Sequence, residues 1–470
     1  MSSLTSVHGR KHLPSTAPGL DPSDTDVGNL PDIAAAGGFH QFFSSLHAQF
    51  GPVASFWFGS EYVVSTSNPD SFREQMRLFN RPKFLFEMFE PLIGSKSIQF
   101  LNDYDGQMFR RKTDAFFGHN SCSELLPQII QIAHNLAVNW SRLPADNYIP
   151  LHSNMILLAL RGILATSFGV HTIEEDKYAE FIRDYETCWN YMEDIVAKGC
   201  SNMDEIESDG NPRKQSFERA KQNLRSMIQD VIERRKQSSE GTRCLIDEII
   251  DSSDSDEQSI DMAITYAIGG FHTTGNLMTW LLYYLLRHEE CYEKLTDELC
   301  SVIGSVSNDM TAEHYNQLIY CRQVTDETLR MSTLAPWAAR YSDDDITIDG
   351  HLVPKKTPII QALGVSLHDE QLWPDPERFN PERFSEANKK DIDPLSCSFF
   401  GFAGKRKCPG YRFAYFEVFA FLSVLLRRFR LRLTEPDQSV ERVYGLVTHP
   451  SEEIWITVET KKSDNFSLDF

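Results

Sequence analysis

The chain has 470 residues, of which 41% are apolar and 24% are charged, and this balance indicates a globular protein rather than a disordered one. Asp and Glu number 67 against 46 Lys and Arg, so the formal net charge is −21. A protein that binds duplex nucleic acid carries the opposite sign of charge, and we therefore exclude that class.

Nine cysteines are scattered along the chain without any C-x-x-C pair. An odd number without paired spacing does not make a disulfide framework, and it fits a reducing compartment. The sequence shows no secretory signal, and no run reaches the roughly 18 apolar residues that a membrane span needs.

The first part of the chain passes from a proline-rich segment to short regular elements. We expect residues 1–32 to form a flexible N-terminal tail, because four prolines there break any helix. The pattern then predicts a helix over 38–50 and a hairpin around Gly59-Ser60. Asn68-Pro69 combines an N-cap type residue with a proline in the first turn, so another helix begins there.

Helical periodicity dominates the middle of the chain. The run over 260–286 is apolar on several faces, so it should form a long helix that crosses the interior. Beyond Pro336 the chain becomes strand-like, before a last long helix over 409–429. Shorter elements are predicted at 125–139, 155–168, two stretches within 175–237, 289–303, 312–320, 322–331, 346–348, 352–353, 358–361 and 454–458.

These elements predict a fold that is mainly α with small peripheral β-sheets. No internal repeat and no domain-scale linker interrupts the pattern, so we expect a single domain over 33–462. Residues 463–470 are expected to form a C-terminal tail.

A cysteine precedes the last long helix, in the segment Gly401-Phe-Ala-Gly-Lys-Arg-Lys-Cys-Pro-Gly410. The amides at the start of that helix favour a thiolate at Cys408. Gly404 and Gly410 let the backbone pass close to a flat macrocycle, and Arg406 can pair with a carboxylate on it. A lone cysteine here would be interpreted as a buried structural residue. The full spacing of Gly, Arg, Cys and Gly favours a metal-ligating thiolate instead.

Two charged patterns lie upstream. Glu327 and Arg330 share one face of a predicted helix and can pair, although most such pairs are solvated surface bridges. Prolines fix Trp373-Pro-Asp-Pro-Glu-Arg-Phe-Asn-Pro-Glu-Arg-Phe384 in an extended meander, from which Arg383 can reach that pair.

The long apolar helix contains Gly269-Gly-Phe-His-Thr-Thr274. Two adjacent glycines cost a helix roughly 1 kcal/mol each relative to alanine, and close approach to a ligand would justify that cost. Close helix–helix packing on the glycines explains the pattern equally well. Thr273 can donate a hydrogen bond to a bound oxygen species or a water.

In order and spacing, these four motifs resemble the cytochrome P-450 superfamily over about residues 28–460. Gly28-Asn-Leu-Pro-Asp-Ile33, Phe50-Gly-Pro-Val53, Ser55-Phe-Trp-Phe-Gly59 and Arg412-Phe-Ala-Tyr415 are similar to family twenty of that superfamily. The resemblance implies the cytochrome P-450 fold, with heme b (iron protoporphyrin IX) between the long central helix and the cysteine loop.

The resemblance also implies roles for single residues. Cys408 matches the proximal ligand of the heme iron, and Gly270, His272 and Thr273 lie in the oxygen-activating, catalytic segment of the long helix. The residues matched to the surroundings of the heme are Arg340, Arg406, Gly404, Gly410, Phe402 and the structural triad Glu327, Arg330 and Arg383.

Three positions depart from the superfamily pattern. The aromatic residue usual seven positions before the cysteine is replaced by Gly401, and either neighbouring ring, Phe400 or Phe402, can pack under the heme. Position 272 usually carries an acid, and His272 can also relay protons, with an unperturbed pKa near 6.5. The usual propionate tryptophan is absent from 106–112, where Arg110, Arg111 or Lys112 would bind a propionate instead.

By the same resemblance the protein is expected to be a monooxygenase that inserts one atom of O2 into a lipophilic small molecule. The mostly apolar segments expected to line the pocket are 84–101, 181–192, 267–274, 333–338 and 446–447. Two interpretations stay open beside this one: a heme-thiolate peroxide isomerase, which His272 allows and Thr273 argues against, and a non-catalytic heme-binding protein.

Electrons must come from a partner protein. Basic runs at 110–112 and 405–412, in a chain of net charge −21, suggest a docking face for an acidic NADPH reductase or ferredoxin. Solvated charges and propionate ligands are the alternative explanation. We expect a monomer peripherally associated with the endoplasmic reticulum membrane, with a mitochondrial or soluble location as the alternatives.

Overall fold

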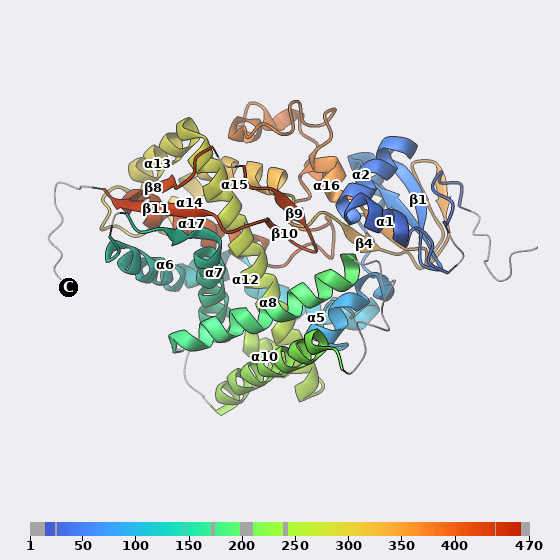
Figure 1. Cartoon of the computed structure of the whole chain (residues 1–470), viewed down its shortest axis with the longest axis horizontal. Helices are drawn as coiled ribbons and strands as arrows, with labels where there is room; N and C mark the ends of the chain where they lie inside the picture. Colours follow the sequence, from blue (N-terminus) through green and yellow to red (C-terminus); the bar gives the residue numbers. More distant parts are fainter. Residues whose placement is uncertain are drawn as a thin grey trace, which may run out of the picture.

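The computed structural model describes residues 15–23, 26–144, 146–170, 174–197, 210–237, 243–437 and 439–461. Near the N-terminus lies a four-stranded sheet of order β1-β2-β7-β4, in which β2 and β7 run parallel and the other neighbours antiparallel. Its strands are β1 (Val53–Phe58), β2 (Glu61–Thr66), β7 (Ile359–Gln361) and β4 (Ala338–Arg340). Helices α1 (Leu30–Ala36) and α2 (Phe39–Phe50) pack on it (Figure 1).

The segment expected to be a flexible tail up to residue 32 is folded over most of its described part. The backbone of Leu20 donates to the carbonyl of Ser55 at 2.9 Å, and that of Asn29 donates to Trp57 at 2.7 Å. Gly19 and Gly28 form isolated bridges with β1. The prolines do exclude a helix, but they leave an extended chain that can pair with the edge of the sheet.

Helices make up most of the remaining structure, with α12 through its centre (Figure 1). The predicted run over 260–286 is the 32-residue α12 (Asp256–Arg287). The other helices are α3 (Pro69–Gln75), α4 (Glu90–Ile93), α5 (Asp103–Asp114), α6 (His119–Ser141), α7 (Leu151–Phe168), α8 (Glu175–Ala197), α10 (Pro212–Gln237), α11 (Leu245–Ser252), α13 (Glu289–Ile303), α14 (Ala312–Gln317), α15 (Ile319–Ser332), α16 (Leu363–Leu367) and α17 (Tyr411–Arg428), with the 3₁₀ turns η1 (Lys83–Phe89), η2 (Ala115–Phe117), η3 (Pro381–Phe384), η4 (Lys389–Asp391) and η5 (Pro394–Cys397).

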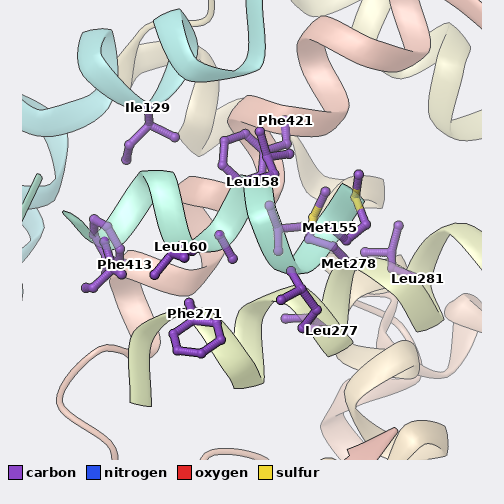
Figure 2. Packing of buried hydrophobic residues seen from close by; sticks show 14 of the residues in the cluster. Ile129, Met155, Leu158, Leu160, Phe271, Leu277, Met278, Leu281, Phe413 and Phe421 are labelled. Atoms are coloured by element: carbon purple, nitrogen blue, oxygen red, sulfur yellow. The ribbon is translucent and has the colours of Figure 1, made fainter. Parts of the chain in front are cut away.

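The core is built where α7 lies between α12 and α17. Figure 2 shows Met155 and Leu158 of α7 close to Leu277 and Met278 of α12, with Phe421 of α17 on the other side. All five side chains are buried, and burying each one contributes roughly 1.5–3 kcal/mol. This packing fixes the long helix in the interior.

In the described part of the chain, three smaller sheets lie around the helices, as the sequence predicts. They are β3-β11-β8, with β3 (Ile149–Pro150), β11 (Trp455–Thr460) and β8 (Phe429–Leu433); the pair β5 (Ile346–Ile348) and β6 (His351–Val353); and the pair β9 (Arg442–Tyr444) and β10 (Thr448–Pro450). The expectation of a mainly α fold with small peripheral sheets is confirmed.

One of the described helices, α7, is long and apolar enough to cross a membrane by length and composition, although the sequence analysis found no such run. In the fold, 67% of that helix is buried. Its apolar surface is covered by α12 and α17, so the core packing explains its composition.

Candidate active site

Cys408 lies in the loop between η5 and the start of α17, as the sequence predicts. Its backbone N–H donates to the carbonyl of Phe400 at 3.1 Å, which fixes the loop. Burial raises the pKa of the Cys408 thiol, while the charge of Arg110, the N–H of Gly410 and the charge of Lys407 lower it. The cysteine thus faces a cation and a helix N-terminal amide, the groups that stabilise a thiolate.

The two glycines of the cysteine motif, Gly404 and Gly410, contribute to the loop in different ways. Gly404 has φ +86°, and a Cβ there would lie 2.0 Å from the carbonyl oxygen of Met76 at the end of α3. Its missing side chain therefore lets the loop pack on α3 as well as adopt a left-handed turn. Gly410 has φ −79° and contributes its N–H to the cysteine thiol.

The two phenylalanines beside Gly401 separate into different surroundings. Phe402 is fully buried against Phe72, with ring centroids 5.6 Å apart, and its ring lies 5.9 Å from the Arg340 guanidinium. Phe400 is partly exposed and packs on Tyr415 of α17 at 5.5 Å. The ring of Phe402 is thus the one beside an arginine predicted to contact the heme.

Four arginines from separate parts of the chain gather near the cysteine: Arg81, Arg110, Arg340 and Arg406. Burial, followed by the charge of Arg81, lowers the pKa of Arg340 well below its usual value. Burial and three neighbouring arginines lower the pKa of Arg406 to about 7. The positive charges of Arg81 and Arg110 therefore act on both Arg340 and Arg406.

The arginine cluster lacks matching negative charge. Within the described ranges, Asp114 is the one carboxylate that hydrogen bonds to any of the four, and it pairs with Arg110 at 2.6 Å. Arg406 donates instead to the carbonyls of Ile98 and Leu101 at 2.6 and 2.8 Å. Among the residues that the structure describes, none accepts a hydrogen bond from the buried Nε atoms of Arg81, Arg340 and Arg406. Buried donors without a partner are costly, and an anion that accepts their hydrogen bonds would remove that cost.

Among the three candidates for the propionate position on α5, the structure brings Arg110 inward and leaves Lys112 outside. Phe109, Arg110 and Thr113 lie on the buried face of the helix, and Arg110 also donates to the carbonyl of Lys407 at 2.6 Å. Lys112 is exposed, and its Nζ lies 3.4 Å from the Ser252 hydroxyl. The expectation for Lys112 is therefore wrong, because the phase of the helix turns it to solvent.

Glu327 and Arg330 form a buried ion pair rather than a surface bridge. Both side chains are 0% exposed, and Arg330 donates to the two carboxylate oxygens at 2.8 and 2.9 Å. Arg383 adds a third contact, with its Nε 3.3 Å from Glu327. Arg330 and Arg383 also donate to the carbonyls of Pro376 and Asp375. The triad fastens the proline meander to α15, and its hydrogen bonds do not reach the cysteine loop.

The two adjacent glycines of α12 also lie in different surroundings. A Cβ on Gly270 would lie 2.5 Å from Cγ1 of Ile163, so this glycine allows close packing with α7. This packing is the structural reason for glycine at position 270, and the catalytic role expected for Gly270 stays a prediction. A Cβ on Gly269 would meet nothing within 4 Å, and Gly269 is exposed within an otherwise buried stretch. The Thr273 hydroxyl donates to the Gly269 carbonyl at 2.8 Å, on this open face of α12.

His272 does not face solvent or a carboxylate. Its Nδ1 lies 2.8 Å from the Tyr185 hydroxyl of α8, and its ring packs edge-on against Trp189, with centroids 4.7 Å apart. Burial, with smaller effects of His449 and His152, lowers the pKa of His272 to about 3. Burial thus favours the neutral imidazole at physiological pH, and the expected proton relay through His272 stays a prediction.

Sequence reasoning missed two functional candidates. Arg81 joins the arginine cluster from the loop after α3, where its backbone is hydrogen bonded to the Asn102 side chain. Glu417 of α17 is fully buried, and burial raises its pKa well above the usual value. Neither residue lies in a motif, so only the three-dimensional contacts reveal them.

Comparison with known proteins decides the family. The family model described as Cytochrome P450 matches residues 18–457. The chain belongs to the cytochrome P450 family. Cytochrome P450 20A1 of Bos taurus is 31% identical over 94% of this chain and 93% of its own length, and the Homo sapiens protein of that name is 30% identical over the same shares. These relatives confirm the resemblance to family twenty.

More distant similarity extends to a protein described as a self-sufficient cytochrome P450 monooxygenase, CYP505E3 of Phanerodontia chrysosporium. It is 26% identical over 71% of this chain and 32% of its own length. P450 proteins bind heme b and incorporate oxygen with electrons from a redox partner, so this chain is a heme-dependent monooxygenase.

The residues of the site fit heme b. The cofactor carries two propionate carboxylates, which match the uncompensated charge and unpaired Nε donors of the arginine cluster. In such a complex Cys408 would ligate the iron, and the donors of Arg81, Arg110, Arg340 and Arg406 would bind the propionates.

Proposed function

We propose that this P450 oxygenates a lipophilic small molecule on the open face of α12, with electrons delivered by an acidic partner protein. The observation that carries the proposal is the pairing of Thr273 with the Gly269 carbonyl on that face. A hydroxyl and a carbonyl exposed together within a buried helix can position water or a protonated group at one point.

The surroundings of that face support an apolar substrate. The Trp189 ring of α8 packs edge-on against the ring of His272, next to Thr273, and Phe89 of η1 packs on Trp189. The polar atoms of Tyr185 and His272 bond to each other, so the rings supply apolar surface. Heme, when bound, supplies the oxygen activation that side chains cannot perform. The protein contributes the thiolate ligand, orientation and exclusion of water.

The proposed docking face joins α5 to the cysteine loop. Arg110 of α5 donates to the Lys407 carbonyl, so the two basic runs are neighbours. Arg111, Lys112, Lys405 and Arg412 are exposed there. This local positive charge in a chain of net charge −21 supports an acidic reductase or ferredoxin as the electron donor. We further infer a monomer at the endoplasmic reticulum membrane from the family resemblance.

The test is a turnover assay under ¹⁸O2 with NADPH, an acidic reductase and a panel of sterols and fatty acids. We expect one product that carries a single ¹⁸O atom, and no such product with Cys408→Ala. Turnover of a hydroperoxide without NADPH, together with no ¹⁸O product, would contradict the proposal and favour a peroxide isomerase.

A further inference from the structure

His272 and Tyr185 join two helices in the interior of the protein. The Tyr185 hydroxyl of α8 lies 2.8 Å from Nδ1 of His272 on α12, and the two side chains belong to residues only 3% and 7% exposed. His272 directly precedes Thr273, so the bond is made one residue from the open face of α12. His272 belongs to the glycine motif of α12, and the proposed oxygenation gives it no role.

Aromatic rings surround the hydrogen bond on the α8 side. The Trp189 ring lies 4.7 Å from the His272 ring, and the Tyr185 ring lies 4.8 Å from that of Phe271. Phe89 of η1 contacts Trp189 at 6.0 Å. Because the rings exclude water, a hydrogen bond broken here leaves two buried polar groups unpaired.

The charged groups around the pair do not offer His272 an acid partner. Burial lowers the pKa of His272 to about 3, and the nearby titratable groups His449 of β10 and His152 of α7 lower it by smaller amounts. Around Tyr185, burial raises the pKa of the phenol, with smaller effects of Glu193 and Glu186 on α8. Both partners are therefore neutral between pH 6 and 8, and the bond is the same throughout that range.

The C-terminal half of α8 has a second attachment. The Leu446 backbone N–H, in the turn between β9 and β10, donates to Oε1 of Glu193 at 3.2 Å. A Cβ on Gly445 would lie 2.1 Å from the same oxygen, so this turn approaches α8 closely. Tyr185 and Glu193 are eight residues, or about two helical turns, apart. Tyr185 holds α8 to α12, and Glu193 holds it to the β9–β10 turn.

We propose that Tyr185 and His272 are positioning residues that form a latch between α8 and α12, and that this latch controls the access of bulky apolar molecules to the Thr273 side of the heme. This inference rests on the proposed function, because the access that it controls is access to the heme. Opening requires α8 to move away from α12, which separates the two polar atoms.

The test measures ligand binding to the heme-loaded ferric protein by stopped-flow absorbance, with 4-phenylimidazole as the bulky probe and cyanide as the small one. Tyr185→Phe keeps the ring and removes the hydroxyl. We expect both the association and the dissociation of 4-phenylimidazole to become about 3- to 10-fold faster, as loss of one net hydrogen bond predicts. Cyanide should keep its wild-type rates within about 2-fold.

Two further variants separate the latch from a general loss of stability. Tyr191→Phe is the matched control, because the Tyr191 ring on the same helix stacks on Phe217 of α10 at 4.7 Å. It should leave both probes unchanged. His272→Phe should match Tyr185→Phe, and the double variant should be no faster than either single variant, because both remove the same bond.

Wild-type 4-phenylimidazole rates in Tyr185→Phe would overturn the proposal, as would equal acceleration of both probes or an additive double variant. Absence of any heme absorbance change in the wild-type protein would refute the heme site itself and the latch with it. A latch that behaves as expected in a protein yielding no oxygenated product would instead refute only the proposed function.

Discussion

Replacement of Glu417 by glutamine tests the electrostatics of the helix core. Glu417 is fully buried, and burial raises its pKa well above the usual value of a glutamic acid. Between the pKa of the unfolded chain and that of the folded protein, only the folded state binds the proton. The free energy of unfolding therefore falls as pH rises, by about 1.4 kcal/mol per pH unit. Glu417→Gln removes this pH dependence, because a glutamine side chain does not bind the proton.

We expect the stability difference, Glu417→Gln minus wild type, to increase by about 1.4 kcal/mol between pH 5.5 and 6.5. The assay is urea unfolding of the heme-loaded protein at the two pH values, followed by circular dichroism. The new amide group can also change the free energy of unfolding, but by the same amount at both pH values. The change of the stability difference with pH therefore reports only on the protonation of Glu417. Glu124→Gln, which removes an exposed acid on α6, is the control and should give no comparable slope. A flat or falling difference for Glu417→Gln would refute the protonated state.

Three further substitutions test the site and its support. Arg110→Gln should weaken heme retention at least about 10-fold, because it removes a buried cation, whereas Lys112→Gln should leave retention unchanged. The measurement is the transfer of heme to apomyoglobin. Equal effects of the two substitutions would contradict the placement of Arg110 on the inner face of α5 and of Lys112 on the outer face. Gly404→Ala should lower heme occupancy far more than Gly401→Ala, since both have positive φ but only Gly404 would clash with a backbone carbonyl; similar occupancies would be inconsistent with this packing. Glu327→Gln should cost about 3–5 kcal/mol in urea unfolding, because it leaves two buried arginines without their acid, and a loss below about 1 kcal/mol would mean that the pair acts like a surface bridge.

The parts of the site that the sequence predicts are those fixed by short spacing. Cys408 before a helix and the three-residue spacing of Glu327 and Arg330 are local properties, and the structure contains both arrangements. The long apolar run of α12 likewise identifies an interior helix. These predictions succeed because helix periodicity and the start of a helix act over a few residues.

The failures concern helix phase and long-range contact. The basic run on α5 does not reveal that residue 110 points inward and residue 112 outward. The order of the two glycines in α12 does not reveal that Gly270 meets Ile163 of α7. His272 is buried, which lowers its pKa, and its hydrogen-bond partner Tyr185 is 87 residues away in the sequence. Only tertiary packing determines these relations.

The most direct test of the central claim is the carbon monoxide difference spectrum of the reduced, heme-loaded protein, for wild type and Cys408→Ala. The account predicts the strongly red-shifted Soret band of a heme-thiolate in the wild-type protein and its loss in Cys408→Ala. An unshifted band that survives the substitution, or no heme uptake by the wild-type protein, would contradict the assignment of Cys408 as the iron ligand.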